Sequence, residues 1–284
     1  MKVARGLVLT LLVLTSARLA AAGGALPSCA AWASTQEGKN LPRVPGPRGA
    51  QRKALLADGG GLVPIDDRYY AAWFAPGFAD APSKRILVAL HGTDGMPEFE
   101  WNGWKEPLAS RGWGFIGLSY LDPASGNYTD DTTIYRQLTQ AIHEVGASCN
   151  AAGARFFLLG FSRGSARSFP VTYLDRKAHA WFTATVANSG SWRLKGRLPE
   201  ILAGIAERDE KTAFAGARFW MYCGEKDREL GFPMCEGMEQ ARDFVRAHGG
   251  QVDALYKDAA GGHGDLVRSA AATRAMFEYL ESLP

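Results

Sequence analysis

Apolar residues recur along the chain with two different periods, which separate predicted strands from predicted helices. Compact apolar runs predict buried strands at residues 86–90, 115–120, 156–159, 182–187, 218–223 and 252–256. An earlier strand at residues 69–74 is expected to form an antiparallel hairpin with residues 60–65. Helices are predicted at residues 128–147, directly after residue 162, and at residues 198–210, 237–248 and 265–283. This alternation indicates an α/β protein whose mainly parallel sheet has helices on both faces.

The length of 284 residues suits one large α/β domain, which we place at residues 56–284. Residues 23–55 are rich in Ala, Pro, Gly and Arg without a clear period, and we interpret them as an extended leader. Residues 1–22 resemble a secretory signal peptide, with Lys2 and Arg5 before an apolar stretch and alanines at the cleavage position. The alternative is an uncleaved membrane anchor, for which this apolar stretch is short.

Removal of the signal peptide would lower the net charge of the chain, and with it the expectation of an acidic partner. The formal charge is +3, and residues 1–22 carry three basic residues and no acidic one. The mature chain would therefore be close to neutral, so neither a nucleic-acid partner nor stable membrane association is expected. We predict a secreted or periplasmic protein.

Export also favours disulfide bonds between the four cysteines, for which three pairings are possible. We prefer Cys223 with Cys235, which would close a short loop around Asp227, and Cys29 with Cys149. The alternative is that the cysteines are free buried thiols.

A G-x-S-x-G motif, from Gly160 to Gly164 with Ser162 at its centre, directly follows the apolar run at residues 156–159. It has the sequence form of a nucleophile elbow, in which a serine stands on a sharp turn between a strand and a helix. The two glycines would let neighbouring backbone approach closely. Pro170 is expected to bend or end the helix that follows. The motif by itself also fits a simple glycine-rich turn.

Two later strands are each followed by a residue that could act with Ser162. Asp227 comes after the strand at residues 218–223, and His263 lies between glycines after the last predicted strand. Nucleophile, acid and base thus appear in the chain order of an α/β-hydrolase triad. Ser162 is the predicted nucleophile, His263 the base and Asp227 the acid that orients it, with Glu225 as the alternative acid. Asp265 is expected to cap the last helix.

With these motifs, residues 85–284 resemble the α/β-hydrolases, and most of all the secreted polyhydroxyalkanoate depolymerase-like and feruloyl esterase-like esterases. The resemblance implies an α/β-hydrolase fold, and the chain length leaves little room for a large lid. It also implies an oxyanion hole with two backbone N–H donors. Arg163, directly after the nucleophile, is one expected donor, and Thr93, after His91-Gly92, is the other.

Aromatic residues near these motifs are candidates for a substrate cleft. Trp101, Trp104 and Trp113 lie close to the oxyanion segment in sequence, and Trp192 follows the strand at residues 182–187. The alternative is that these side chains belong to the core. The Arg163 side chain could contact the surroundings of the elbow helix, or an acidic or carbonyl-rich substrate.

These features predict an exported serine carboxylic-ester hydrolase that works through an acyl-enzyme. Its expected partner is a small-molecule or polymeric ester, with a small-acyl, phenolic or polyester group. A serine peptidase of the same fold and a non-catalytic binding protein that retains the fold are the alternatives. The sequence contains no phosphate loop, dinucleotide fingerprint or zinc-ligand spacing, so we expect no cofactor and no metal.

Overall fold

The computed structural model describes residues 26–38, 41, 46–122, 125–192, 198–228 and 231–284. The predicted signal peptide at residues 1–22 therefore lies outside the described residues. None of the described helices is long and apolar enough to cross a membrane.

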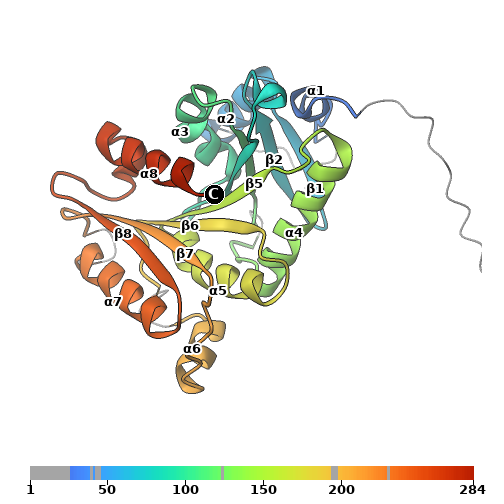
Figure 1. Ribbon diagram of the computed structural model, residues 1–284. Coiled ribbons are helices and arrows are strands. Elements are labelled where there is room, and N and C mark those ends of the chain that lie inside the picture. Colours follow the sequence, from blue (N-terminus) through green and yellow to red (C-terminus); the bar gives the residue numbers. More distant parts are fainter. Residues whose placement is uncertain (1–25, 39–40, 42–45, 123–124, 193–197, 229–230) are drawn as a thin grey trace, which may run out of the picture.

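An 8-stranded sheet runs through the middle of the molecule in the order β1-β2-β4-β3-β5-β6-β7-β8 (Figure 1). The strands are β1 (Gly61–Ile65), β2 (Arg68–Phe74), β3 (Arg85–Leu90), β4 (Gly114–Leu118), β5 (Arg155–Phe161), β6 (Phe182–Asn188), β7 (Arg218–Gly224) and β8 (Gln251–Asp258). Neighbouring strands from β4 to β8 pair in parallel, whereas β2 is antiparallel to both β1 and β4. The predicted hairpin and the mainly parallel sheet are both confirmed.

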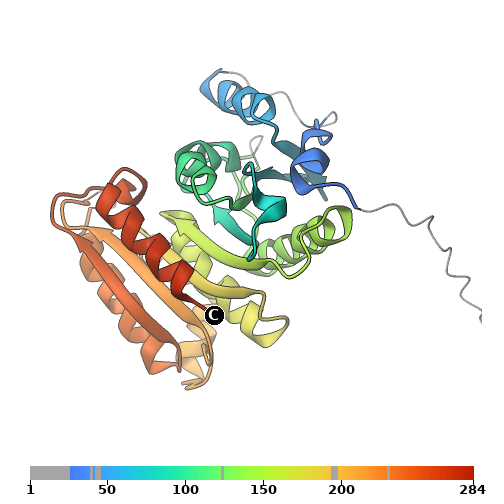
Figure 2. The same cartoon turned by 45° about the horizontal axis from the view of Figure 1, so that its top comes forward.

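Helices cover both faces of the sheet, as predicted (Figure 1 and Figure 2). One face packs against α2 (Gly46–Ala57), α3 (Pro97–Ala109) and α8 (Ala270–Ser282). The other packs against α1 (Cys29–Ser34), α4 (Asp131–Ser148), α5 (Arg163–Lys177), α6 (Glu200–Glu207) and α7 (Met234–Ala247). Alternate residues of β3 face the two cores, with Leu87 in one and Val88 in the other. Burial on both faces explains why these strands are continuous apolar runs.

The segment at residues 23–55, expected to be extended, contains helices in its described part. Ser28 caps α1 by accepting a hydrogen bond from the Ala31 backbone N–H at 3.2 Å, and Cys29 buries its side chain against α4. α2 buries Leu55 in the core shared with α3. The sequence did not predict these helices because α1 has only 6 residues, and because Gly46, Pro47 and Gly49 disguise the start of α2. Tertiary contacts therefore supply most of their stability.

Three other elements differ from the prediction. α5 continues beyond Pro170 to Lys177, because buried residues on both sides of the proline hold the helix in place. α8 begins after Ser269, whose hydroxyl caps it, while Asp265 opens the short 3-10 helix η2 (Asp265–Val267). α3 was not predicted at all, although Pro97 at its start is a common helix signal.

Both preferred disulfide bonds are present, linking Cys29 to Cys149 and Cys223 to Cys235. The first ties α1 to the end of α4, and the second joins the end of β7 to the start of α7. The predicted pairing is therefore confirmed, and the alternative of free thiols is wrong.

Candidate active site

Ser162 stands on a sharp turn between β5 and α5, at the edge of the sheet where the parallel strands end. Its backbone has φ 54° and ψ −114°, a strained conformation for a residue with a side chain. A Cβ atom added to Gly160 would lie 2.2 Å from the Gly164 carbonyl oxygen, and one added to Gly164 would lie 2.0 Å from the Leu90 carbonyl oxygen. Both glycines of the motif are therefore needed for the turn to fit against its neighbours.

The structure brings Ser162, His263 and Asp227 together from the ends of three strands. His263 Nε2 lies 2.9 Å from Ser162 Oγ, and His263 Nδ1 lies 2.8 Å from Asp227 Oδ2. Asp227 is buried, with 1% of its surface exposed. A buried carboxylate beside Nδ1 favours a proton on that nitrogen, which leaves Nε2 as an acceptor for the serine hydroxyl. Glu225, the alternative acid, is exposed.

The loops that carry Asp227 and His263 support each other. The Lys226 backbone N–H donates to the Gly261 carbonyl oxygen at 3.0 Å. A Cβ atom on Gly224 would lie 2.3 Å from that same oxygen, so the two loops meet at backbone contact distance. On its other side, Asp227 accepts a hydrogen bond at its carbonyl oxygen from the Met234 backbone N–H at 3.2 Å. Asp227 is thus held between the loop of His263 and the start of α7.

The loop after β3 approaches the elbow from the opposite side. His91 is buried and stacks on Tyr120, which donates a hydrogen bond to the His91 carbonyl oxygen. Thr93 is exposed, and its hydroxyl accepts a hydrogen bond from Arg163 Nε at 3.3 Å. The Arg163 guanidinium also lies over the ring of Tyr128, 3.9 Å from its centroid. The Arg163 side chain therefore joins the elbow to the loop of Thr93.

A cleft of about 440 Å³ lies next to His263, and residues 99–104 of α3 form one side of it. Its lining includes Phe99, Glu100, Asn102, Trp104, Phe161, Asn188 and Arg268. Of the four tryptophans that the sequence offered for a substrate cleft, Trp104 is among the lining residues, whereas Trp113 lies in the core. Trp101 instead packs in the core against Trp73, and Trp192 packs against Phe244 on α7. The reason is helical geometry, which turns Trp101 to the face of α3 that meets the sheet.

Glu100 is a polar group of the cleft that the sequence analysis missed. Burial raises the pKa of its carboxyl to about 8. The N–H groups of the Trp104 side chain and the Gly92 backbone have a smaller, opposite effect on this pKa, because they favour the charged form. Glu98 and Glu100 follow Pro97, and acidic residues directly after a proline are typical of the first turn of a helix. This signal could have predicted the start of α3. No signal in the sequence alone could have shown that this turn faces His263.

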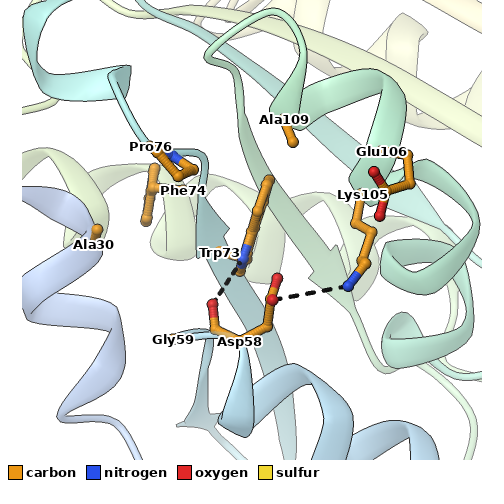
Figure 3. Close-up of a pocket in the computed structure, with 9 residues that line it drawn as sticks. All are labelled: Ala30, Asp58, Gly59, Trp73, Phe74, Pro76, Lys105, Glu106 and Ala109. Atoms are coloured by element: carbon orange, nitrogen blue, oxygen red, sulfur yellow. Dashed lines mark hydrogen bonds and ion pairs between the residues drawn. The ribbon is translucent and has the colours of Figure 1, made fainter.

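A second cavity, of about 350 Å³, lies at the opposite edge of the sheet (Figure 3). Phe74 lines it, and this residue pairs with the first residue of β4, so the cavity is where the parallel strands begin. The Trp73 indole donates to the Asp58 carbonyl oxygen at 3.1 Å, and the Lys105 ammonium lies 3.7 Å from the Asp58 carboxylate. The Trp73 indole, Asp58 and the Lys105 ammonium are therefore paired with one another in this cavity, which lies at the far end of α3 from Glu100.

Comparison with solved structures identifies the fold. Esterases from the fungus Rhizomucor miehei superpose with a TM-score of 0.57 at 15% identity, over 91% of this chain and 97% of theirs. A putative dienelactone hydrolase from Klebsiella pneumoniae matches with a TM-score of 0.56 at 16% identity, over 78% of this chain and 96% of its own. Est1E from Butyrivibrio proteoclasticus matches with a TM-score of 0.53 at 12% identity, over 78% and 99%.

No family model matches the sequence, and no curated protein matches it either. The sheet order and the structural neighbours together show that the chain has the α/β-hydrolase fold. At these identities the likeness extends to the fold alone, because one fold supports many functions.

Proposed function

We propose that this chain is an exported serine hydrolase of carboxylic esters, with Ser162 as nucleophile, His263 as base and Asp227 as the orienting acid. The observation that carries the proposal is the hydrogen-bonded series from Ser162 Oγ through the imidazole to the buried carboxylate. A serine hydroxyl is a weak nucleophile unless a positioned base removes its proton. The strained turn adds support, because it holds the hydroxyl at the edge of the sheet.

In the proposed reaction Ser162 Oγ attacks the ester carbonyl carbon while His263 Nε2 takes its proton. The imidazolium then gives this proton to the leaving alcohol oxygen, and an acyl-enzyme remains. Water, deprotonated by the same nitrogen, attacks the acyl carbon and releases the acid and the free serine. Asp227 keeps the imidazole oriented and stabilises its charged form throughout.

The oxyanion that forms on the carbonyl oxygen needs donors fixed in advance. We assign these to the backbone N–H groups of Arg163 and Thr93. The Arg163 N–H opens α5, where the first-turn N–H groups have no acceptor within the helix. Thr93 is joined to the elbow by the Arg163 side chain, which supports a fixed distance between the two donors.

The proposed substrates are small-molecule or polymeric esters, and the proposed location is outside the cytoplasm. Est1E, whose structure is described with bound ferulic acid, has the same fold at 11% identity and a TM-score of 0.54. Phe99, Trp104 and Phe161 give the cleft aromatic walls that suit a small or phenolic group. Two disulfide bonds support export, because disulfides persist in oxidising compartments.

Hydrolysis of a p-nitrophenyl ester series by the mature chain, beside the Ser162→Ala variant, tests this function. We expect kcat/KM to fall as the acyl chain lengthens, and activity to be lost in the variant. Ester activity that survives in Ser162→Ala would overturn the assignment of the nucleophile. A wild type that cleaves peptides but no ester would favour the peptidase, and one that cleaves neither would favour a binding protein.

A further inference from the structure

Glu100 places a carboxyl group in the wall of the cleft that adjoins His263. It lies on the first turn of α3, is half-buried, and lines the cleft together with Asn102 and Asn188. The Trp104 indole and the Gly92 backbone N–H interact with this carboxyl group. The proposed reaction gives Glu100 no role in proton transfer, so the carboxyl group needs another explanation.

The surroundings of Glu100 favour its neutral form at neutral pH. Burial raises the pKa of the carboxyl to about 8, and the charged or titratable groups around it do little to oppose this. Tyr120, two residues after the end of β4, is neutral because burial raises the pKa of its hydroxyl far above neutral pH. Arg268 is largely exposed and pairs with Asp265 at 3.2 Å, so solvent and its partner screen its charge.

A neutral carboxyl group has one O–H to donate in addition to its acceptor sites. The O–H remains as the group's donor, on a side chain that lines the cleft. The cleft lies against His263, and Nε2 must reach the leaving oxygen, so the alcohol portion of an ester can enter the cleft while its leaving oxygen meets Nε2.

We propose that Glu100 determines specificity for the alcohol portion of the ester, by donating a hydrogen bond from the cleft wall to an uncharged oxygen acceptor in that portion. This inference rests on the proposed function and names its substrate class: esters of alcohols that carry an ether, hydroxyl or carbonyl oxygen. Ionisation of Glu100 would remove the donor and place a negative charge near the loop of Thr93. Selection for such alcohols should therefore be lost in alkaline solution.

A pair of esters with nearly equal shape tests the hydrogen bond. In 2-methoxyethyl acetate an ether oxygen replaces one methylene of butyl acetate, and the ratio of their kcat/KM values measures selection for that oxygen. At pH 7 we expect the ratio to fall about three- to tenfold in Glu100→Leu, the range that one neutral hydrogen bond supplies. Glu100→Gln, whose amide can still donate, should keep more of the ratio than Glu100→Leu. An equal ratio in wild type and Glu100→Leu would overturn the inference.

The pH dependence separates a donor from a merely structural side chain. Above about pH 8, the wild-type kcat/KM for 2-methoxyethyl acetate should fall relative to that for butyl acetate, whereas the ratio in Glu100→Gln should stay level. The matched control is Glu106→Gln, on the same helix but at the cavity of Figure 3, and it should follow the wild type. If the ratio of the two kcat/KM values falls equally in Glu100→Gln, Glu100 is not the hydrogen-bond donor.

Thermal unfolding provides a readout that needs no substrate. A folded-state pKa raised from 4.5 to about 8 means that this carboxyl's contribution to stability is complete below pH 4.5 and is lost as the pH rises through 8. The Tm of Glu100→Gln relative to wild type should therefore be higher at pH 9 than at pH 5. A constant difference would contradict a neutral Glu100. If the wild type hydrolyses esters but the ester ratio and the Tm difference do not change as described, only this inference is rejected. If the wild type hydrolyses no ester, the proposed function is rejected.

Discussion

At the residue scale, burial separates two carboxylates that the sequence leaves equivalent. Asp227 and Glu225 share one turn after β7, and either could follow a strand end as the acid of a triad. Asp227 is buried and contacts His263 Nδ1 at 2.8 Å, whereas Glu225 is exposed. Only a buried carboxylate in fixed contact can hold the imidazole in one orientation, so the two residues should differ sharply on substitution.

Asp227→Asn should lower kcat for ester hydrolysis by about 10⁴-fold, the order found when the acid of another serine triad is replaced. The amide no longer favours a proton on Nδ1, so Nε2 is not kept free to act as the base. Steady-state kinetics on one p-nitrophenyl ester measures the loss. Glu225→Gln is the matched control and should leave kcat close to wild type, and a large loss in this control would reassign the acid.

At the scale of elements, the elbow depends on glycines outside its own motif. Gly190 follows β6, and a Cβ atom there would lie 1.9 Å from the Ser162 carbonyl oxygen. The Ser162 backbone N–H also donates to the Asn188 carbonyl oxygen at 2.9 Å. The end of β6 and the residues after it are therefore in direct backbone contact with the turn that carries Ser162. Gly190 cannot be singled out from the sequence, because this contact joins the segments that follow two different strands.

Gly190→Ala should destabilise the protein by about 1–3 kcal/mol, because the added methyl group forces backbone apart at the elbow. We expect kcat to fall as well, since Ser162 moves with that backbone. Gly146→Ala is the control: it lies within α4, its Cβ would meet nothing within 4 Å, and alanine should stabilise the helix by about 0.5–1 kcal/mol. Urea unfolding compares the two, and a harmless Gly190→Ala would contradict the close contact.

The first turn of α3 carries two acidic residues with different roles, one in the core and one in the cleft wall. Glu98 is buried and accepts hydrogen bonds from the Arg52 guanidinium at 3.0 Å and the Tyr69 hydroxyl at 2.8 Å. These contacts join α2, α3 and β2. Glu100 lies two residues later, about 200° around the helix, and so lines the cleft instead. Glu98 therefore anchors the turn that presents Glu100.

At the scale of the whole molecule, the two disulfide bonds constrain different parts of the structure. Cys29 and Cys149 are 120 residues apart and fasten the N-terminal helix to the domain, whereas Cys223 and Cys235 are 12 apart and close the loop that carries Asp227. A longer closed loop restricts the unfolded chain more. The first bond should therefore govern global stability, and the second the geometry of the acid.

Replacing both Cys29 and Cys149 by serine should cost about 5 kcal/mol of unfolding free energy, and replacing Cys223 and Cys235 about 3 kcal/mol, if loop entropy dominates. Denaturant unfolding measures both values. In the folded proteins kcat should fall more in the second variant, because its open loop holds Asp227 less firmly. A larger loss of kcat in the first variant would contradict this division.

The sequence by itself determined the strands of the parallel sheet, the hairpin before it and the chain order of Ser162, Asp227 and His263. These features are local, because a strand buried on both faces is an unbroken apolar run and a sharp turn needs its own glycines. Tertiary structure alone decided that Trp101 belongs to the core and that Glu100 lines the cleft. The face that a helix turns inward depends on its packing partners, and those partners are distant in the sequence.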